Sequence, residues 1–197
     1  MTFLAHLYLA DDTTYARIGA LLPDLVRGPL PDDLHPDIMA SVQLHRRIDV
    51  LTDTHPIVAC SLSRLTRLQR RYHGIIIDMF YDHILARDWS RYHSQNLRLF
   101  IDQVYSDLHR NELLMPKAMR PSIQRMLLND WLGSYSTIQG MIDILEMMST
   151  HMTQRLGRDI QMTSAIDDLV EPDQLLTADF KAFFPALMDQ LKITVNV

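Results

Sequence analysis

Proline and glycine divide this chain into segments of helical length, and strand-like patterning is almost absent between them. Only "IIID", which begins at Ile75, is β-branched, and it lies inside a longer helical pattern. The chain holds 6 glycines against 12 methionines, and a composition poor in glycine and rich in Leu, Met and Ala favours helix over sheet. With 197 residues, the chain suits one domain. We therefore predict an all-α fold, a single-domain helical bundle over residues 1–197.

Prolines, glycines and capping threonines set the expected helix boundaries. Thr13 or Thr14 begins the first predicted helix, Gly28 ends it, and Pro23 should end or kink it near Leu22. Gly74 is expected to separate the third helix from the fourth, and the polar segment 154–172 is ambiguous. We expect roughly seven to nine helices. The second lies within 31–53 with Pro36 in its first turn, and the third, within 55–73, begins at Pro56. The others are expected at about 75–88, 94–110, 119–131, 135–153 and 173–191.

Charge and cysteine content restrict the function classes. The net charge of −5 is mixed along the chain, which argues against a nucleic-acid-binding protein. Cys60 is alone and cannot form an internal disulfide, which fits a reducing compartment. No stretch approaches about 18 uninterrupted apolar residues, and the start has no basic region typical of a signal peptide. We expect a soluble cytoplasmic protein that uses neither nucleic acid nor a membrane as partner.

Residues 75–89, IIIDMFYDHILARDW, place two carboxylates and an imidazole in an otherwise apolar helix. Asp78 and Asp82 are four residues apart and share one face, and His83 lies at its edge. A helix that is apolar on most sides is usually buried, and buried carboxylates are costly unless they are paired or bound to a cation. Ion pairs with arginines such as Arg46 or Arg87 would offset the cost of burying these carboxylates, and a bound divalent metal would do the same.

Three further segments add possible ligands. His45 and Asp49 in LHRRIDVLTDTHP are also four residues apart, although many solvated helices show this spacing. His6 lies in FLAHLYLA, where a lone histidine is more often a core residue, and Asp24 in LLPDLVRG suits a helix cap. Together the four segments supply carboxylate and imidazole without a Cys-rich zinc pattern. This set indicates an oxygen-and-imidazole metal site inside a helical bundle.

Four ordered motifs resemble those of one known family. FLAHLYLA, GALLPDLVRG, LHRRIDVLTDTHP and DMFYDHILARDWSRY, together with the less specific NDWLGSY, resemble the acyl carrier protein phosphodiesterase family over roughly residues 1–135. The resemblance implies a mostly α-helical fold likened to HD-type metal-dependent phosphohydrolases. It also implies removal of the 4′-phosphopantetheine arm from holo acyl carrier protein, with a divalent cation, Mn²⁺ (or Mg²⁺), as cofactor. Two departures are Pro23, where alanine is expected, and Tyr8, where a second histidine is expected.

The resemblance also carries over a set of site residues as a hypothesis. The metal ligands would be Asp24, His45, Asp49, Asp78 and Asp82. A further ligand or a general acid would be His83 or His6, with Arg46 on the phosphate. Further substrate-binding residues would be Arg27 and Arg47, which can otherwise be solvated charges.

The implied partner is acidic, so a basic docking surface is expected. Arg64, Arg67 and Arg71 fall on one face of the predicted helix 55–73, which can serve for docking or be a solvated basic face. Two other functions stay open. One is an HD-type phosphohydrolase acting on a nucleotide or another small phosphoester, and the other is a catalytically dead, carrier-binding helical protein.

Overall fold

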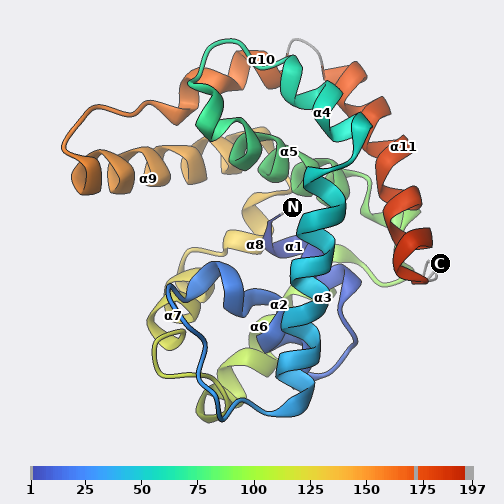
Figure 1. Ribbon diagram of the computed structural model, residues 1–197, viewed down its shortest axis with the longest axis vertical. Coiled ribbons are helices and arrows are strands. Elements are labelled where there is room, and N and C mark those ends of the chain that lie inside the picture. Colours follow the sequence, from blue (N-terminus) through green and yellow to red (C-terminus); the bar gives the residue numbers. More distant parts are fainter. Residues whose placement is uncertain (1, 171–172, 194–197) are drawn as a thin grey trace.

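The computed structural model describes residues 2–170 and 173–193, and within these ranges the regular structure is entirely helical (Figure 1). The predicted all-α fold is confirmed. Short 3₁₀ turns lie at Arg70–Tyr72, Trp89–Arg91, Glu112–Leu114 and Met162–Ala165. The α-helices are α1 (Phe3–Leu9), α2 (Thr14–Leu25), α3 (Pro36–Asp53), α4 (Pro56–Ser63), α5 (His73–Arg87), α6 (Leu97–Arg110), α7 (Arg120–Leu128), α8 (Trp131–Ser134), α9 (Ile138–Leu156), α10 (Ile166–Val170) and α11 (Asp173–Leu191).

Local sequence signals account for most helix starts. Pro36 and Pro56 occupy the first turns of α3 and α4, where the missing N–H of proline costs no helical hydrogen bond. The Thr13 side chain accepts a hydrogen bond from the Ala16 N–H and so caps α2. These starts match the sequence prediction because each depends on neighbouring residues alone.

Two predicted boundaries are wrong. Pro23 lies inside α2, which continues to Leu25, so of the two outcomes expected near Leu22, an end or a kink, the end does not occur. Pro23 has no N–H to donate to the Gly19 carbonyl, yet the helix continues for two more residues. Gly74 lies in the first turn of α5 and separates nothing, since the 3₁₀ turn at Arg70–Tyr72 leads directly into that helix.

The predicted helix 55–73 is also wrong, because α4 ends at Ser63. The backbone N–H groups of Thr66 and Arg67 donate to the Asp168 carboxylate, each at 2.7 Å. Asp168 comes from a segment that was ambiguous in the sequence. Its carboxylate satisfies two backbone donors that a continuous helix would have used internally.

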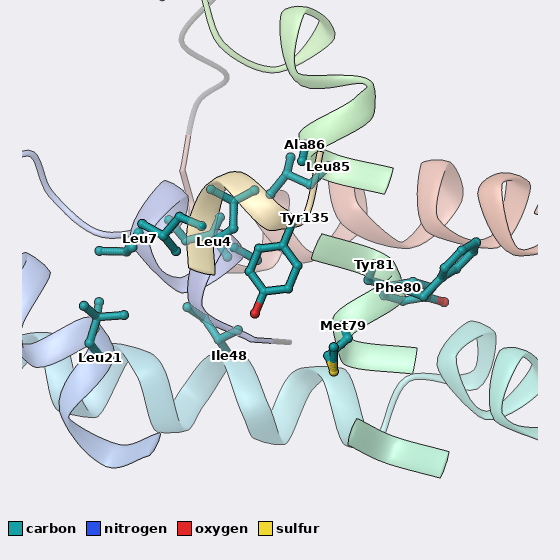
Figure 2. Close-up of a cluster of buried hydrophobic side chains, with 14 of the residues drawn as sticks. Leu4, Leu7, Leu21, Ile48, Met79, Phe80, Tyr81, Leu85, Ala86 and Tyr135 are labelled. Atoms are coloured by element: carbon teal, nitrogen blue, oxygen red, sulfur yellow. The ribbon is translucent and has the colours of Figure 1, made fainter. Parts of the chain in front are cut away.

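The core is one cluster of buried apolar side chains, and α5 runs through it. Ile76, Ile77, Phe80 and Ile84 are fully buried, which confirms the prediction of a buried apolar helix. Figure 2 shows side chains of α1, α3 and α5 gathered around the ring of Tyr135. None of the helices in the described ranges has the length and apolarity needed to cross a membrane.

Helices α2 and α3 lie side by side (Figure 1). Their contact is close at Gly19. A Cβ atom on Gly19 would lie 2.4 Å from the Ile38 carbonyl oxygen and 2.6 Å from the Ser41 Cβ. The Ser41 hydroxyl donates to the Ala16 carbonyl at 2.7 Å across the same contact. Glycine therefore lets the two backbones approach, and α1 packs against α2 beside them.

Candidate metal centre

Two histidines and an aspartate converge where α1 meets α3. His6 comes from α1, and His45 and Asp49 lie one turn apart on α3. The Nε2 atoms of His6 and His45 each lie 3.2 Å from one oxygen of the Asp49 carboxylate. The imidazole rings stack with centroids 3.7 Å apart and planes 13° from parallel. One ligand atom from each residue lies within 4.8 Å of the others, which is close enough for all three to bind a single ion.

The centre is dry on the histidine side and open on the carboxylate side. Both imidazoles are about 1 % exposed, whereas the side chain of Asp49 is 42 % exposed. Asp24, just before the end of α2, adds a carboxylate oxygen 3.7 Å from His45 Nε2 and is 38 % exposed. An ion or a substrate can therefore approach from the carboxylate side.

A backbone carbonyl fixes the tautomer of His45. Its Nδ1 lies 2.7 Å from the Ala20 carbonyl oxygen, which can only accept, so Nδ1 carries a hydrogen. Nε2 therefore faces the carboxylates of Asp49 and Asp24 with either a lone pair or a second proton. A lone pair there would be repelled unless a cation lay between. Burial alone would lower the pKa of His45, but the hydrogen bond to Asp49 and the charge of Asp24 raise it above its usual value.

The remaining pKa values leave the other two residues in their metal-binding forms. Burial lowers the pKa of His6 to about 4, although its bond to Asp49 opposes the change, so this imidazole is neutral at neutral pH. Burial would raise the pKa of Asp49, but hydrogen bonds from His45 and His6 hold it well below its usual range. Neutral imidazole and ionised carboxylate are the forms that coordinate metals.

Further carboxylates surround this group. Burial raises the pKa of Asp24, and the charges of Asp49 and Asp78 raise it further. Asp53, one turn beyond Asp49 on α3, has its pKa raised by burial and then by Asp78 and Asp49. Asp24 and Asp53 are therefore each close enough to Asp49 and Asp78 to be repelled electrostatically. Carboxylates beside imidazole suit a divalent cation such as Mn²⁺, and the donor set fits the expected cofactor.

Asp82 and His83 lie outside this group. Asp82 is fully buried, and the backbone N–H groups of Leu4 and Ala5 donate to it. His83 Nδ1 lies 2.8 Å from the Tyr135 carbonyl oxygen, and burial lowers the pKa of this histidine. The structure thus brings together His6, His45, Asp49 and Asp24 of the expected set. The Ala20 carbonyl was missed, and since it is a backbone atom no residue type could have indicated it.

The arginines expected to bind phosphate separate into two groups. Arg27 follows Asp24 by three residues, Arg46 is adjacent to His45, and both are exposed. Within the described ranges neither forms an ion pair with a carboxylate. Arg47 instead donates from Nη2 to the Gln190 carbonyl oxygen at 2.8 Å, at the end of α11.

The arginines expected on one helical face do not share one, because α4 ends at Ser63. Arg64 pairs with Asp179 at 3.2 Å across the contact between α4 and α11. The Arg71 guanidinium lies over the Tyr72 ring, 4.6 Å from its centroid. Arg67, Arg71 and Arg158 instead line a hollow of about 300 Å³.

Comparison with known proteins gives a consistent result over the full length. The family model described as acyl carrier protein phosphodiesterase matches residues 1–187. The acyl carrier protein phosphodiesterase of Yersinia enterocolitica is 31 % identical over 191 residues, covering 96 % of this chain and 97 % of the relative. That of Escherichia coli O6:H1 is 32 % identical over 193 residues, covering 96 % and 97 %. That of Shigella boydii is 44 % identical over 91 residues, covering 46 % and 47 %.

No solved structure matches the chain. The likeness to HD-type phosphohydrolases therefore stays a prediction from the sequence motifs.

Proposed function

The chain belongs to the acyl carrier protein phosphodiesterase family, and from this premise we propose that it removes the 4′-phosphopantetheine arm from holo acyl carrier protein. The bond to be hydrolysed is the phosphodiester between a carrier serine and the arm. We place this reaction at the centre formed by His6, His45 and Asp49, with Mn²⁺ or Mg²⁺ as cofactor.

The observation that carries the proposal is the orientation of His45. The Ala20 carbonyl accepts a hydrogen bond from the Nδ1–H of His45, and the Nε2 atom then faces the carboxylates of Asp49 and Asp24. In metal sites a ligating histidine usually donates its other ring N–H to a carbonyl or a carboxylate in this way, which fixes the ring and its tautomer. When bound, a divalent cation supplies Lewis-acid chemistry, neutralising phosphate oxygens and making water more acidic.

The chain's own residues hold and orient the substrate. Asp49 bridges both imidazoles and keeps their Nε2 atoms on one side of the centre. Arg27, three residues after Asp24, and Arg46, next to His45 in the sequence, are exposed and offer planar guanidinium groups that match phosphate oxygens. The buried walls on the histidine side keep bulk water away from His6 and His45, which strengthens their interactions with Asp49.

The acidic carrier protein needs a complementary surface, and the hollow lined by Arg67, Arg71 and Arg158 offers one. Three arginines and one carboxylate, Asp159, line the hollow, whereas the whole chain carries a net charge of −5. We place carrier docking there, in place of the helical face expected from the sequence. Arg67 also pairs with Asp167 at 2.6 Å, which leaves Arg71 and Arg158 as the stronger docking charges.

Mass measurement of the carrier tests the reaction directly. Holo carrier protein incubated with the enzyme and Mn²⁺ should lose the mass of 4′-phosphopantetheine and become apo carrier protein. The variant Asp49→Asn should abolish this loss. Asp143→Asn on α9, where the side chain is exposed and accepts only from Gln139 among the described residues, should leave it unchanged.

Other outcomes would support the competing functions. An unchanged carrier mass, with turnover of a small phosphoester, would indicate a different phosphohydrolase. Carrier binding without any hydrolysis, and without bound metal, would indicate a carrier-binding protein that lacks activity.

A further inference from the structure

The helix that carries His6 is too short to hold its own position. α1 has 7 residues, and isolated helices shorter than about 12–15 residues are marginal in water. Its first N–H groups have no partner within the helix and need acceptors from elsewhere. Thr2, which precedes the helix, does not cap it with its side chain.

Asp82 of α5 supplies these acceptors. Its Oδ2 accepts from the Leu4 N–H at 2.8 Å and from the Thr2 hydroxyl at 2.5 Å, and its Oδ1 accepts from the Ala5 N–H at 3.2 Å. The carboxylate is fully buried and lies at the positive end of the α1 dipole. Burial raises the pKa of Asp82 to about 7, and the three donors act against that rise.

The anchored residues directly precede His6 in the sequence. Leu4 and Ala5 place the next residue, His6, so that its ring stacks on His45 and its Nε2 reaches Asp49. Both oxygens of Asp82 accept hydrogen bonds from protein donors, so this buried carboxylate is satisfied without an ion.

We propose that Asp82 is a positioning residue for the metal centre: it fixes the start of α1 against α5 and thereby sets His6 against His45 and Asp49. The inference rests on the proposed function for the identity of the bound ion. The placement of His6 itself is a property of the metal-free chain.

Asp168 provides a matched control. Like Asp82, it is a buried aspartate that accepts two backbone N–H bonds and one threonine hydroxyl, from Thr66 and Arg67. It anchors the segment after α4, and among the described residues none of its bonds reaches α1. Asp168→Asn weakens the same kinds of hydrogen bond as Asp82→Asn, and in addition an ion pair with Arg67 at 3.5 Å, without touching the element that carries His6.

Metal affinity and ring signals then separate a positioning role from a general structural one. Titration of the folded variants with Mn²⁺ should show affinity lowered about 10–100-fold in Asp82→Asn, the range found for residues that orient metal ligands. Asp168→Asn should retain the wild-type affinity. In a His6→Ala background, adding Asp82→Asn should lower affinity no further, because the residue acts through His6. Additive losses in the double variant, or equal losses in Asp82→Asn and Asp168→Asn, would overturn the inference.

A second readout needs no metal. In the NMR spectrum of the metal-free protein, the His6 and His45 ring signals should shift in Asp82→Asn and stay in place in Asp168→Asn, because ring stacking depends on α1. Unchanged ring signals in Asp82→Asn would overturn the positioning role even where the wild type hydrolyses the carrier. If the wild type binds no Mn²⁺ and the ring signals still shift in Asp82→Asn, only the proposed cofactor would be overturned. Should Asp82→Asn not fold, Thr2→Val removes one of the three donors and should shift the same signals by less.

Discussion

Replacement of Gly19 by alanine tests whether the close contact between α2 and α3 maintains the centre. The added Cβ would lie 2.4 Å from the Ile38 carbonyl oxygen and 2.6 Å from the Ser41 Cβ, against an ordinary contact distance of about 3.5 Å. The Ile38 oxygen is a backbone atom, so relief requires the helices to separate by about 1 Å. Overpacking of this kind costs about 1–3 kcal/mol, and the backbone clash places the expected loss near the upper end, about 3 kcal/mol.

The same separation acts on the centre, because α2 and α3 each carry part of it. α2 supplies the Ala20 carbonyl and Asp24, and α3 supplies His45 and Asp49. The bond of 2.7 Å between His45 Nδ1 and the Ala20 carbonyl oxygen would lengthen, and His45 would lose its fixed tautomer. We therefore expect Gly19→Ala to lower both the free energy of unfolding and the affinity for Mn²⁺.

Urea denaturation of Gly19→Ala beside Gly74→Ala is the assay. Gly74 lies in the first turn of α5, and a Cβ there would meet no atom within 4 Å among the described residues. Alanine at that position should stabilise the protein by about 0.5 kcal/mol, because glycine loses more conformational freedom on folding. The two substitutions should thus have opposite signs. A Gly19→Ala variant as stable as the wild type, with the same affinity for Mn²⁺, would refute the reasoning.

Three further predictions follow from the contacts described above. Arg71→Glu should raise KM for holo carrier protein and change its salt dependence, whereas Arg125→Glu on α7 should alter neither, and equal effects would contradict docking at the hollow. Burial lowers the pKa of His83, so the unfolded chain gains a proton that the folded chain does not as pH falls below about 6.5. The free energy of unfolding of the wild type should therefore fall between pH 7 and pH 5.5. Thermal denaturation at both pH values should show a smaller fall in His83→Gln than in the wild type. Equal falls in the two proteins would exclude His83 as the cause. Tyr81→Phe removes a buried hydroxyl 2.8 Å from Ser61 Oγ and should cost about 1 kcal/mol in urea denaturation with turnover unchanged, whereas an unaltered midpoint would mean that the bond contributes no net stability.

The parts of the fold that the sequence predicts are those decided by neighbours. Pro36 and Pro56 begin helices because a proline and its flanking residues are enough to favour a first turn. The end of α4 is not of this kind. It depends on Asp168, whose carboxylate accepts hydrogen bonds from the N–H groups of Thr66 and Arg67, about a hundred residues earlier in the sequence. A pattern of neighbouring residues cannot indicate a contact over that separation.

The candidate site divides in the same way. His45 and Asp49 are one helical turn apart, so their proximity follows from the sequence and the structure places both at the centre. Asp82 and Asp78 share that spacing, yet Asp82 bonds to backbone groups 77 and 78 residues away. A buried carboxylate needs a cation, an ion pair or several N–H donors, and the sequence prediction considered only the first two. Backbone N–H groups carry no residue identity, so the third solution could not be recognised.

The anchoring of α1 by α5 also bears on the order in which the centre forms during synthesis. A chain is made from its N-terminal end, and α1 leaves the ribosome long before α5 does. α1 is too short to persist alone, and its acceptor, Asp82, is made 78 residues after Leu4. The histidines and aspartates of the first three helices are therefore synthesised well before His6 can be set in place. We therefore expect the proposed ion to bind only after α5 has been synthesised and has anchored α1.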